Sequence, residues 1–122
     1  RLLQKGVKKI IVSLGSKGSM LVESGKYVHI SALKATPVDS CGAGDAFTAA
    51  LMAELVQGRS FHSAANFASA YAATKVSQIK YFPSRRDVKK RFSQDELDEN
   101  FKKHKSFESL QDACNYISSL LR

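Results

Sequence analysis

The start of the chain combines short apolar runs with glycine turns, and this pattern predicts a strand followed by a hairpin. Residues 8–14 (Lys-Lys-Ile-Ile-Val-Ser-Leu) form a β-branched run that ends at Gly15, as buried strands do. Residues 19–23 and 27–31 are again rich in apolar side chains and flank residues 24–26 (Ser-Gly-Lys), a tight-turn sequence. We therefore expect a buried strand and then a β-hairpin.

Two helices are predicted in the middle of the chain. The first begins within Gly42-Ala-Gly-Asp45 and runs to Val56, and Gly58 suits the left-handed turn that often follows a helix. Ser60 can cap the second helix, which is rich in alanine and reaches about Ser77. Because its side chains are small, this helix can lie close to a neighbouring helix or to a flat ligand.

The last part of the chain is more polar. Ser84 and Asp87 have the spacing of a capping box and predict the start of a short helix. After Phe92 the composition shifts to a charged stretch, which we interpret as a linker. A final helix is expected from Ser106. Its apolar stripe consists of Phe107, Leu110, Cys114, Ile117 and Leu121.

Composition narrows the class of protein. The 122 residues are 43% hydrophobic and 25% charged, as in an ordinary globular protein with one modest domain. No apolar run approaches the roughly 18 residues that span a bilayer, so we expect no membrane partner. Cys41 and Cys114 lack metal-ligand spacing, and two reduced thiols indicate a cytoplasmic protein. The chain begins at Arg1 without Met, from which we expect it to be cut from a longer one.

The net charge of +8 indicates that the chain could bind an anionic partner. A basic surface attracts phosphorylated substrates and nucleotides as readily as nucleic acid. Much of the basic excess lies in residues 85–91 and 102–105, which are interrupted by Asp87 and by the acidic stretch 95–99. Neither basic run carries the interleaved aromatic residues of RNA-binding sheets. We therefore interpret these runs as solvated helix faces and expect no nucleic-acid partner.

The segment Cys41-Gly-Ala-Gly-Asp45 carries the candidate chemistry. Its glycines permit backbone conformations that other residues resist, and a helix that starts there presents unpaired N–H groups and the positive end of its dipole. Such a terminus binds anions. An ionised Asp45 could cap the helix, or it could accept the proton of a hydroxyl that attacks a phosphoryl group. By itself the string is also typical of an ordinary turn.

The surroundings of this segment resemble a known family. Residues 38–47 (Val-Asp-Ser-Cys-Gly-Ala-Gly-Asp-Ala-Phe) are similar to the second signature of the PfkB carbohydrate kinases, the ribokinase-like family, which usually has Thr-Thr where this chain has Ser40-Cys41. Residues 9–18 look like that family's strand and nucleotide-contacting Thr-Leu-Gly-x-x-Gly. The resemblance covers about residues 5 to 92.

The resemblance implies a fold and a division of the chain. The family fold is a three-layer α/β/α sandwich, so this chain would be the carboxy-terminal portion of a ribokinase-like α/β sandwich with an extra terminal helix. Residues 1–92 would be the carboxy-terminal part of the kinase domain. Residues 93–122 would be a charged linker and an amphipathic helix, which could pack back on the domain or lead to a further one.

The resemblance also implies an activity: ATP-dependent phosphorylation of a hydroxyl on a sugar, sugar phosphate or nucleoside. ATP with Mg²⁺ would be the cofactor, and a monovalent cation such as K⁺ a further one. The implied site residues are Asp45 as general base, Gly42, Ala43 and Gly44 as anion hole, Ser13, Gly15, Gly18, Asn66 and Ser69 along the nucleotide, and Asp39, Cys41 and Ser84 around the monovalent cation.

Several family features are absent from the sequence. The substrate-binding amino-terminal region, the lid strands and the first signature lie upstream in complete members, and Lys80 stands where many members have glycine. We therefore expect the isolated chain to be inactive without an upstream kinase region or a partner chain, and the complete protein could be a homodimer. A nucleotide-binding or regulatory module without catalysis is the alternative, although Asp45 and the glycines are retained.

The remaining candidate residues have simpler interpretations. His29, His62 and His104 lack partners at metal or triad spacing, and His29 is expected at a surface or strand edge. Cys114 is expected in the core, because it lies on the apolar stripe of the last helix. Lys17 lies in a glycine turn that could approach phosphates, but no Walker motif surrounds it.

Overall fold

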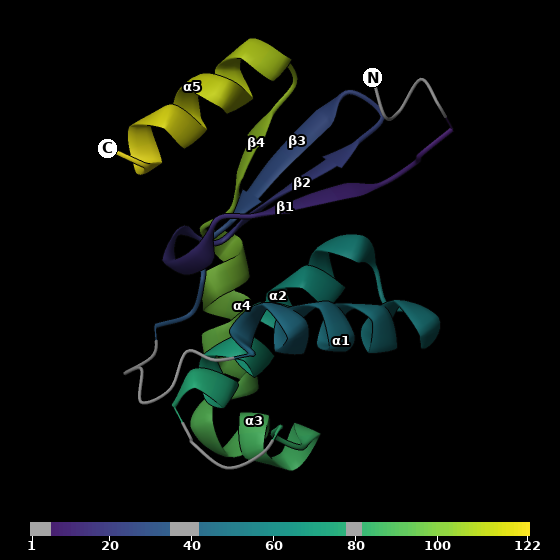
Figure 1. The fold of residues 1–122 in the computed structure, drawn as a ribbon, viewed down its shortest axis with the longest axis vertical. Helices are drawn as coiled ribbons and strands as arrows, with labels where there is room; N and C mark the ends of the chain where they lie inside the picture. The colour runs from purple at the N-terminus through teal and green to yellow at the C-terminus, as the bar shows by residue number, and fades with distance from the viewer. Residues whose placement is uncertain (1–5, 35–41, 78–81) are drawn as a thin grey trace.

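A computed structural model describes residues 6–34, 42–77 and 82–122. Its centre is an antiparallel sheet with strands in the order β1-β2-β3-β4, and helices lie on both faces (Figure 1). The strands are β1 (Ile10–Ser13), β2 (Ser19–Glu23), β3 (Lys26–Ile30) and β4 (Lys105–Phe107). The predicted strand and hairpin are confirmed, and β4 adds a strand from the far end of the chain.

Strand β1 is less buried than its sequence predicts. Ile11 packs against the core, whereas the next side chain points to the other face and Val12 is 43% exposed. Within the described residues β1 is an edge strand that pairs only with β2. The prediction of a buried strand is therefore wrong for the described residues, although its apolar run is typical of strands that are covered on both faces.

Helices α1 (Ala43–Val56) and α2 (Phe61–Val76) cover one face of the sheet. Both match the predicted helices, and Ser60 caps α2 by accepting a hydrogen bond from the Ser63 amide at 3.1 Å. The alanines of α2 allow close packing, as expected from their size. The core cluster consists of Leu21, Val28, Ile30, Ala50, Leu51, Phe61, Ala64, Ala65 and Ala68.

Helices α3 (Arg85–Arg91) and α4 (Gln94–Lys102) pack against α2, and α4 runs from α3 back to the end of the sheet, where Asn100 donates to the Ser31 carbonyl (Figure 1). The predicted capping box at Ser84 and Asp87 is present. The expectation of a linker after Phe92 is wrong, because a second capping box at Ser93 and Glu96 starts α4. The division of the chain at residue 92 stays a prediction.

A second, smaller core lies between α2, α3 and α4. It consists of Ala70, Ala73, Val88, Phe92 and Leu97, with Leu33, Phe67 and Tyr71 packed against it. Burial, and to a lesser degree the negative charge of Asp87, raise the pKa of the Tyr71 phenol above its usual value. The phenol is therefore protonated at neutral pH.

The last helix, α5 (Leu110–Leu120), starts later than predicted. Ser106 and Phe107 belong to β4, which pairs with β3, and Ser109 caps α5. Cys114 is exposed, so the prediction that it packs in the core is wrong. Instead the Tyr116 ring lies 5.1 Å from that of Phe107, which places α5 on the sheet face opposite α1 and α2.

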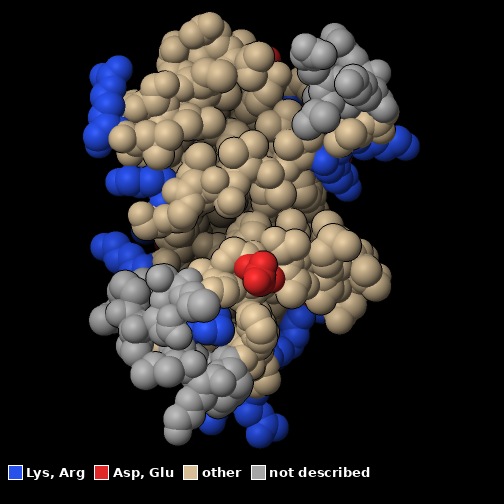
Figure 2. All heavy atoms as spheres, viewed as in Figure 1, with Lys and Arg blue, Asp and Glu red and all other residues tan. Residues whose placement is uncertain are grey.

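Two general properties of the surface follow from the described residues. None of the described helices is both long and apolar enough to cross a membrane. Figure 2 shows lysine and arginine side chains around the rim of one face, with few carboxylates on it. The net charge of +8 is therefore displayed at the surface, where it can attract anionic ligands.

Candidate functional site

The amino terminus of α1 has the geometry of an anion site. Gly42 is its N-cap, with φ of 80° and ψ of 6°, a left-handed conformation that favours glycine. The Ala46 amide donates to the Gly42 carbonyl at 2.8 Å, so the helix is hydrogen-bonded from its first turn. The amides of Ala43, Gly44 and Asp45 precede that bond and have no acceptor within the helix. Asp45 is exposed in this first turn, beside them.

A basic residue that sequence reasoning missed lies beside Gly42. A β-carbon placed on Gly42 would meet Phe82 Cζ at 3.9 Å and Lys75 Cε at 4.0 Å. Lys75 comes from the last turn of α2, is buried, and has its Nζ 5.8 Å from the centre of the Phe82 ring. The fold thus adds a positive charge to the end of α1. A lysine in an alanine-rich helix was the only signal in the sequence.

The glycine turn after β1 is compact. It consists of Leu14, the 3₁₀ segment Gly15–Lys17 and Gly18, hereafter the 14–18 turn. The Leu14 amide donates to the Gly18 carbonyl at 2.8 Å, and the Lys17 amide donates to the Leu14 carbonyl at 3.1 Å. Ser13 and Gly15 are exposed, and a β-carbon on Gly15 would meet nothing within 4 Å. A ligand can therefore approach the turn at Gly15.

Two other residues that were predicted to bind the nucleotide have side chains that form hydrogen bonds inside the protein. The Asn66 amide donates to the Leu97 carbonyl at 2.8 Å, and its oxygen accepts from Asn100 at 2.9 Å. Ser69 Oγ accepts from the Leu33 amide at 3.2 Å. Both side chains are buried and tie α2 to its neighbours. Their contact with a nucleotide stays a prediction.

The predicted monovalent cation site is only partly described. Ser84 caps α3, and its Oγ accepts from the Asp87 amide at 3.2 Å. Asp39 and Cys41 lie outside the described residues. Among the residues that the structure does describe, no group of three or more His, Cys, Asp or Glu side chains is placed to hold a metal ion.

Comparison with known proteins identifies the family. The model of the pfkB family carbohydrate kinases matches residues 1–81, which include the 14–18 turn and all of α1. The chain belongs to the pfkB family. The resemblance read from residues 38–47 is thereby confirmed, and α3, α4, β4 and α5 lie beyond the matched residues.

Individual pfkB relatives show what share of their length this chain covers. Ribokinase from Arabidopsis thaliana is 42% identical over 86 residues, which cover 69% of this chain and 23% of that protein. Deoxyribokinase from Salmonella typhi is 36% identical over 76 residues, which cover 62% of this chain and 25% of that one. The chain therefore spans about a quarter of the length of these curated relatives.

A solved pfkB structure confirms the α/β fold. The structure of Arabidopsis thaliana ribokinase complexed with ribose and ATP superposes with a TM-score of 0.66 at 40% identity. The superposition covers 72% of this chain and 30% of that one. The expectation of a ribokinase-like fold fragment is therefore confirmed.

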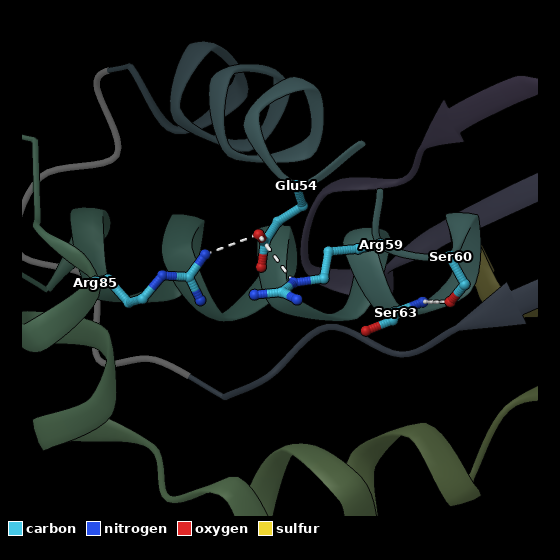
Figure 3. A network of polar contacts seen from close by, with 5 residues as sticks. All are labelled: Glu54, Arg59, Ser60, Ser63 and Arg85. Carbon is cyan, nitrogen blue, oxygen red and sulfur yellow. Dashed lines mark hydrogen bonds and ion pairs between the residues drawn. The ribbon is translucent and has the colours of Figure 1, made fainter. Parts of the chain in front are cut away.

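A cavity of about 280 Å³ lies at the other end of α1, between α1, α2, α3 and α4. Glu54 lines it and is buried, and its Oε2 is 2.7 Å from Arg85 Nη2 and 3.8 Å from Arg59 Nε (Figure 3). The Arg85 guanidinium also lies 4.4 Å from the centre of the Phe67 ring. This network joins α1 to α3, and the pfkB match ends before α3 begins.

Replacing Glu54 by glutamine should lower the free energy of unfolding by about 1–2 kcal/mol. Loss of one partner of a buried ion pair costs more than this, but Arg85 and Arg59 are 43% and 52% exposed, so solvent screens part of the interaction. Urea denaturation measures the effect. Glu99→Gln is the matched control, because Glu99 forms an exposed ion pair with Lys102, and its loss should cost under about 0.5 kcal/mol. Equal costs for the two variants would contradict this account of Glu54.

Proposed function

We propose that this chain is part of a kinase that transfers the γ-phosphoryl group of ATP to a hydroxyl of a sugar, sugar phosphate or nucleoside. The observation that carries the proposal is the exposed Asp45 in the first turn of α1, next to the left-handed Gly42. Membership of the pfkB family supports the same reaction class. The structure of Arabidopsis thaliana ribokinase is complexed with ribose and ATP, which supports a sugar as acceptor and ATP as donor.

In the proposed mechanism Asp45 accepts the proton of the acceptor hydroxyl, whose oxygen attacks the γ-phosphorus in line. The bond from the γ-phosphorus to the β,γ-bridging oxygen breaks, and ADP leaves. The amides of Gly42, Ala43 and Gly44 stabilise the negative charge on the transferred group, assisted by the α1 dipole. ATP would lie along Ser13 and the 14–18 turn. Mg²⁺ would arrive bound to ATP and offset the charge of its phosphates.

A monovalent cation such as K⁺ is a further part of the proposal. It would be held near Asp39, Cys41 and Ser84, as the family resemblance implies. ATP as donor agrees with the cytoplasmic location that the cysteine content predicts.

We also propose that the chain acts only together with a further kinase segment, in the same polypeptide or as a partner. The chain spans about a quarter of its curated relatives. Among the residues that the structure describes, β1 pairs only on its β2 side, so its outer edge and the exposed Val12 offer backbone groups and apolar surface to such a segment. An added strand would cover both, as the continuous apolar run of β1 favours.

The purified 122-residue chain should therefore transfer no phosphate, whereas the kinase that contains it together with the remaining family length should. Radiolabelled ATP with ribose, deoxyribose, a sugar phosphate or a nucleoside as acceptor measures the transfer. Transfer by the isolated chain would contradict the need for a second segment. Nucleotide binding without transfer to any acceptor by the longer protein would favour the alternative, a regulatory module without catalysis.

A further inference from the structure

His29 links the last helix, which lies beyond the family match, to the 14–18 turn. Strand β4 pairs with β3, and α5 returns over the face of the sheet that carries His29. Tyr116 of α5 stacks edge-on against the His29 ring, with ring centres 5.0 Å apart. The matched family residues end at 81, so both β4 and α5 are additions to that part.

His29 joins this helix to the turn. It is only 2% exposed, which corrects the expectation of a surface residue. Its Nε2 lies 2.6 Å from the Lys17 carbonyl oxygen, and its Nδ1 lies 3.3 Å from the Tyr116 hydroxyl. A carbonyl oxygen only accepts, so Nε2 carries the hydrogen. In the neutral ring Nδ1 is then the acceptor for the hydroxyl of Tyr116.

The acceptor of this bond lies inside the 14–18 turn. The Lys17 amide is bonded to the Leu14 carbonyl on one side of the residue, and the Lys17 carbonyl to His29 on the other. His29 therefore restrains a peptide group between Gly15 and Gly18. The bond is partly buried, and loss of the His29 N–H would leave the Lys17 carbonyl without this donor.

We propose that Tyr116 and His29 are positioning residues through which β4 and α5 hold the 14–18 turn in its nucleotide-binding shape. A turn that is ordered before ATP arrives loses less conformational entropy on binding, which increases affinity. The role in ATP affinity rests on the proposed function, whereas the restraint of the turn does not. Neither residue is among the proposed catalytic residues, so the chemical step itself should be unaffected.

Two variants and a matched control test the restraint of the turn. His29→Phe keeps a ring of similar size and removes both nitrogens, and Tyr116→Phe removes only the hydroxyl. Tyr27→Phe removes a hydroxyl from the same face of β3, where Tyr27 pairs with Phe107. Amide hydrogen exchange of residues 14–18 should become about fivefold faster in His29→Phe, as the net loss of one hydrogen bond predicts, and about twofold faster in Tyr116→Phe. Tyr27→Phe should leave it unchanged.

The second measurement is made on the longer kinase that contains the chain. His29→Phe should raise the KM for ATP about fivefold, with kcat and the acceptor KM unchanged, because only the nucleotide turn is loosened. Unchanged exchange of residues 14–18 in both variants would overturn the proposal. Faster exchange in a protein that binds no ATP would confirm the restraint, and would overturn both the proposed function and the role in ATP affinity.

Discussion

Replacing Asp45 by asparagine should lower kcat of the complete kinase by about 100-fold to 10,000-fold, the contribution usual for a positioned general base. Asparagine keeps the size of the side chain but cannot accept a proton from the acceptor hydroxyl. Asp45 is exposed in the first turn of α1, so the substitution disturbs no packing. The affinity for ATP should stay nearly unchanged, because the 14–18 turn and the α1 amides remain.

The helix itself needs a control, since a first-turn carboxylate also stabilises the positive end of a helix. That contribution is about 0.3–1 kcal/mol at an exposed position. Glu96→Gln removes the corresponding carboxylate from the first turn of α4, where it completes a capping box. It should lower the free energy of unfolding by about 1 kcal/mol and leave kcat alone. An Asp45→Asn kinase that turns over at the normal rate would disprove the assignment of the base.

Much of the fold was predictable because the residue at which a helix begins is determined by side chains next to it in the sequence. Ser60 marks the start of α2, and Ser84 with Asp87 marks the start of α3. The same spacing recurs at Ser93 and Glu96, so the start of α4 could also have been predicted from the sequence. The charged composition of this stretch led instead to the prediction of a linker. Local hydrogen bonds of side chains thus determine these ends, whatever the tertiary packing.

The errors concern contacts between distant parts of the chain. His29 is buried because β4 and Tyr116, 87 residues later, lie beside it, and nothing near His29 in the sequence indicates them. The apolar run of β1 predicts burial that the described residues do not supply, since Val12 faces outward at the edge. The burial of a side chain depends on which segments of the protein cover it. A hydrophobic pattern in the sequence indicates only a preference for burial.

In the candidate site, too, the features set by neighbouring residues were predicted and the contacts between distant residues were not. The turn at Gly42 and the place of Asp45 follow from a short motif, because glycine permits the left-handed cap there. Lys75 was missed, since only the packing of α2 against the start of α1 brings it beside Gly42. Asn66 and Ser69 were predicted to bind the nucleotide because they match positions of the family. Their hydrogen bonds to Leu97 and Leu33 could not be predicted, since they depend on how α4 and the connector after β3 pack against α2.

Replacing Gly18 by alanine should lower the free energy of unfolding by about 4 kcal/mol or more, the largest expected effect on stability. Gly18 has φ of 97° and ψ of −142°, a region that residues with a β-carbon hardly enter. A β-carbon there would lie 2.1 Å from the Ile30 carbonyl oxygen and 3.0 Å from the Ala32 nitrogen. Both are backbone atoms, so relief of the clash requires β3 to move away from the turn.

Gly25→Ala separates the two causes of this loss. Gly25 also has a positive φ, 78°, but a β-carbon there meets nothing within 4 Å. It should therefore show backbone strain alone, about 1 kcal/mol. Urea denaturation followed by circular dichroism compares the variants, and a Gly18→Ala chain that is unfolded in water agrees with the expected loss. If the two alanine variants had equal stability, the close approach of the 14–18 turn to β3 would not be what requires glycine at this position.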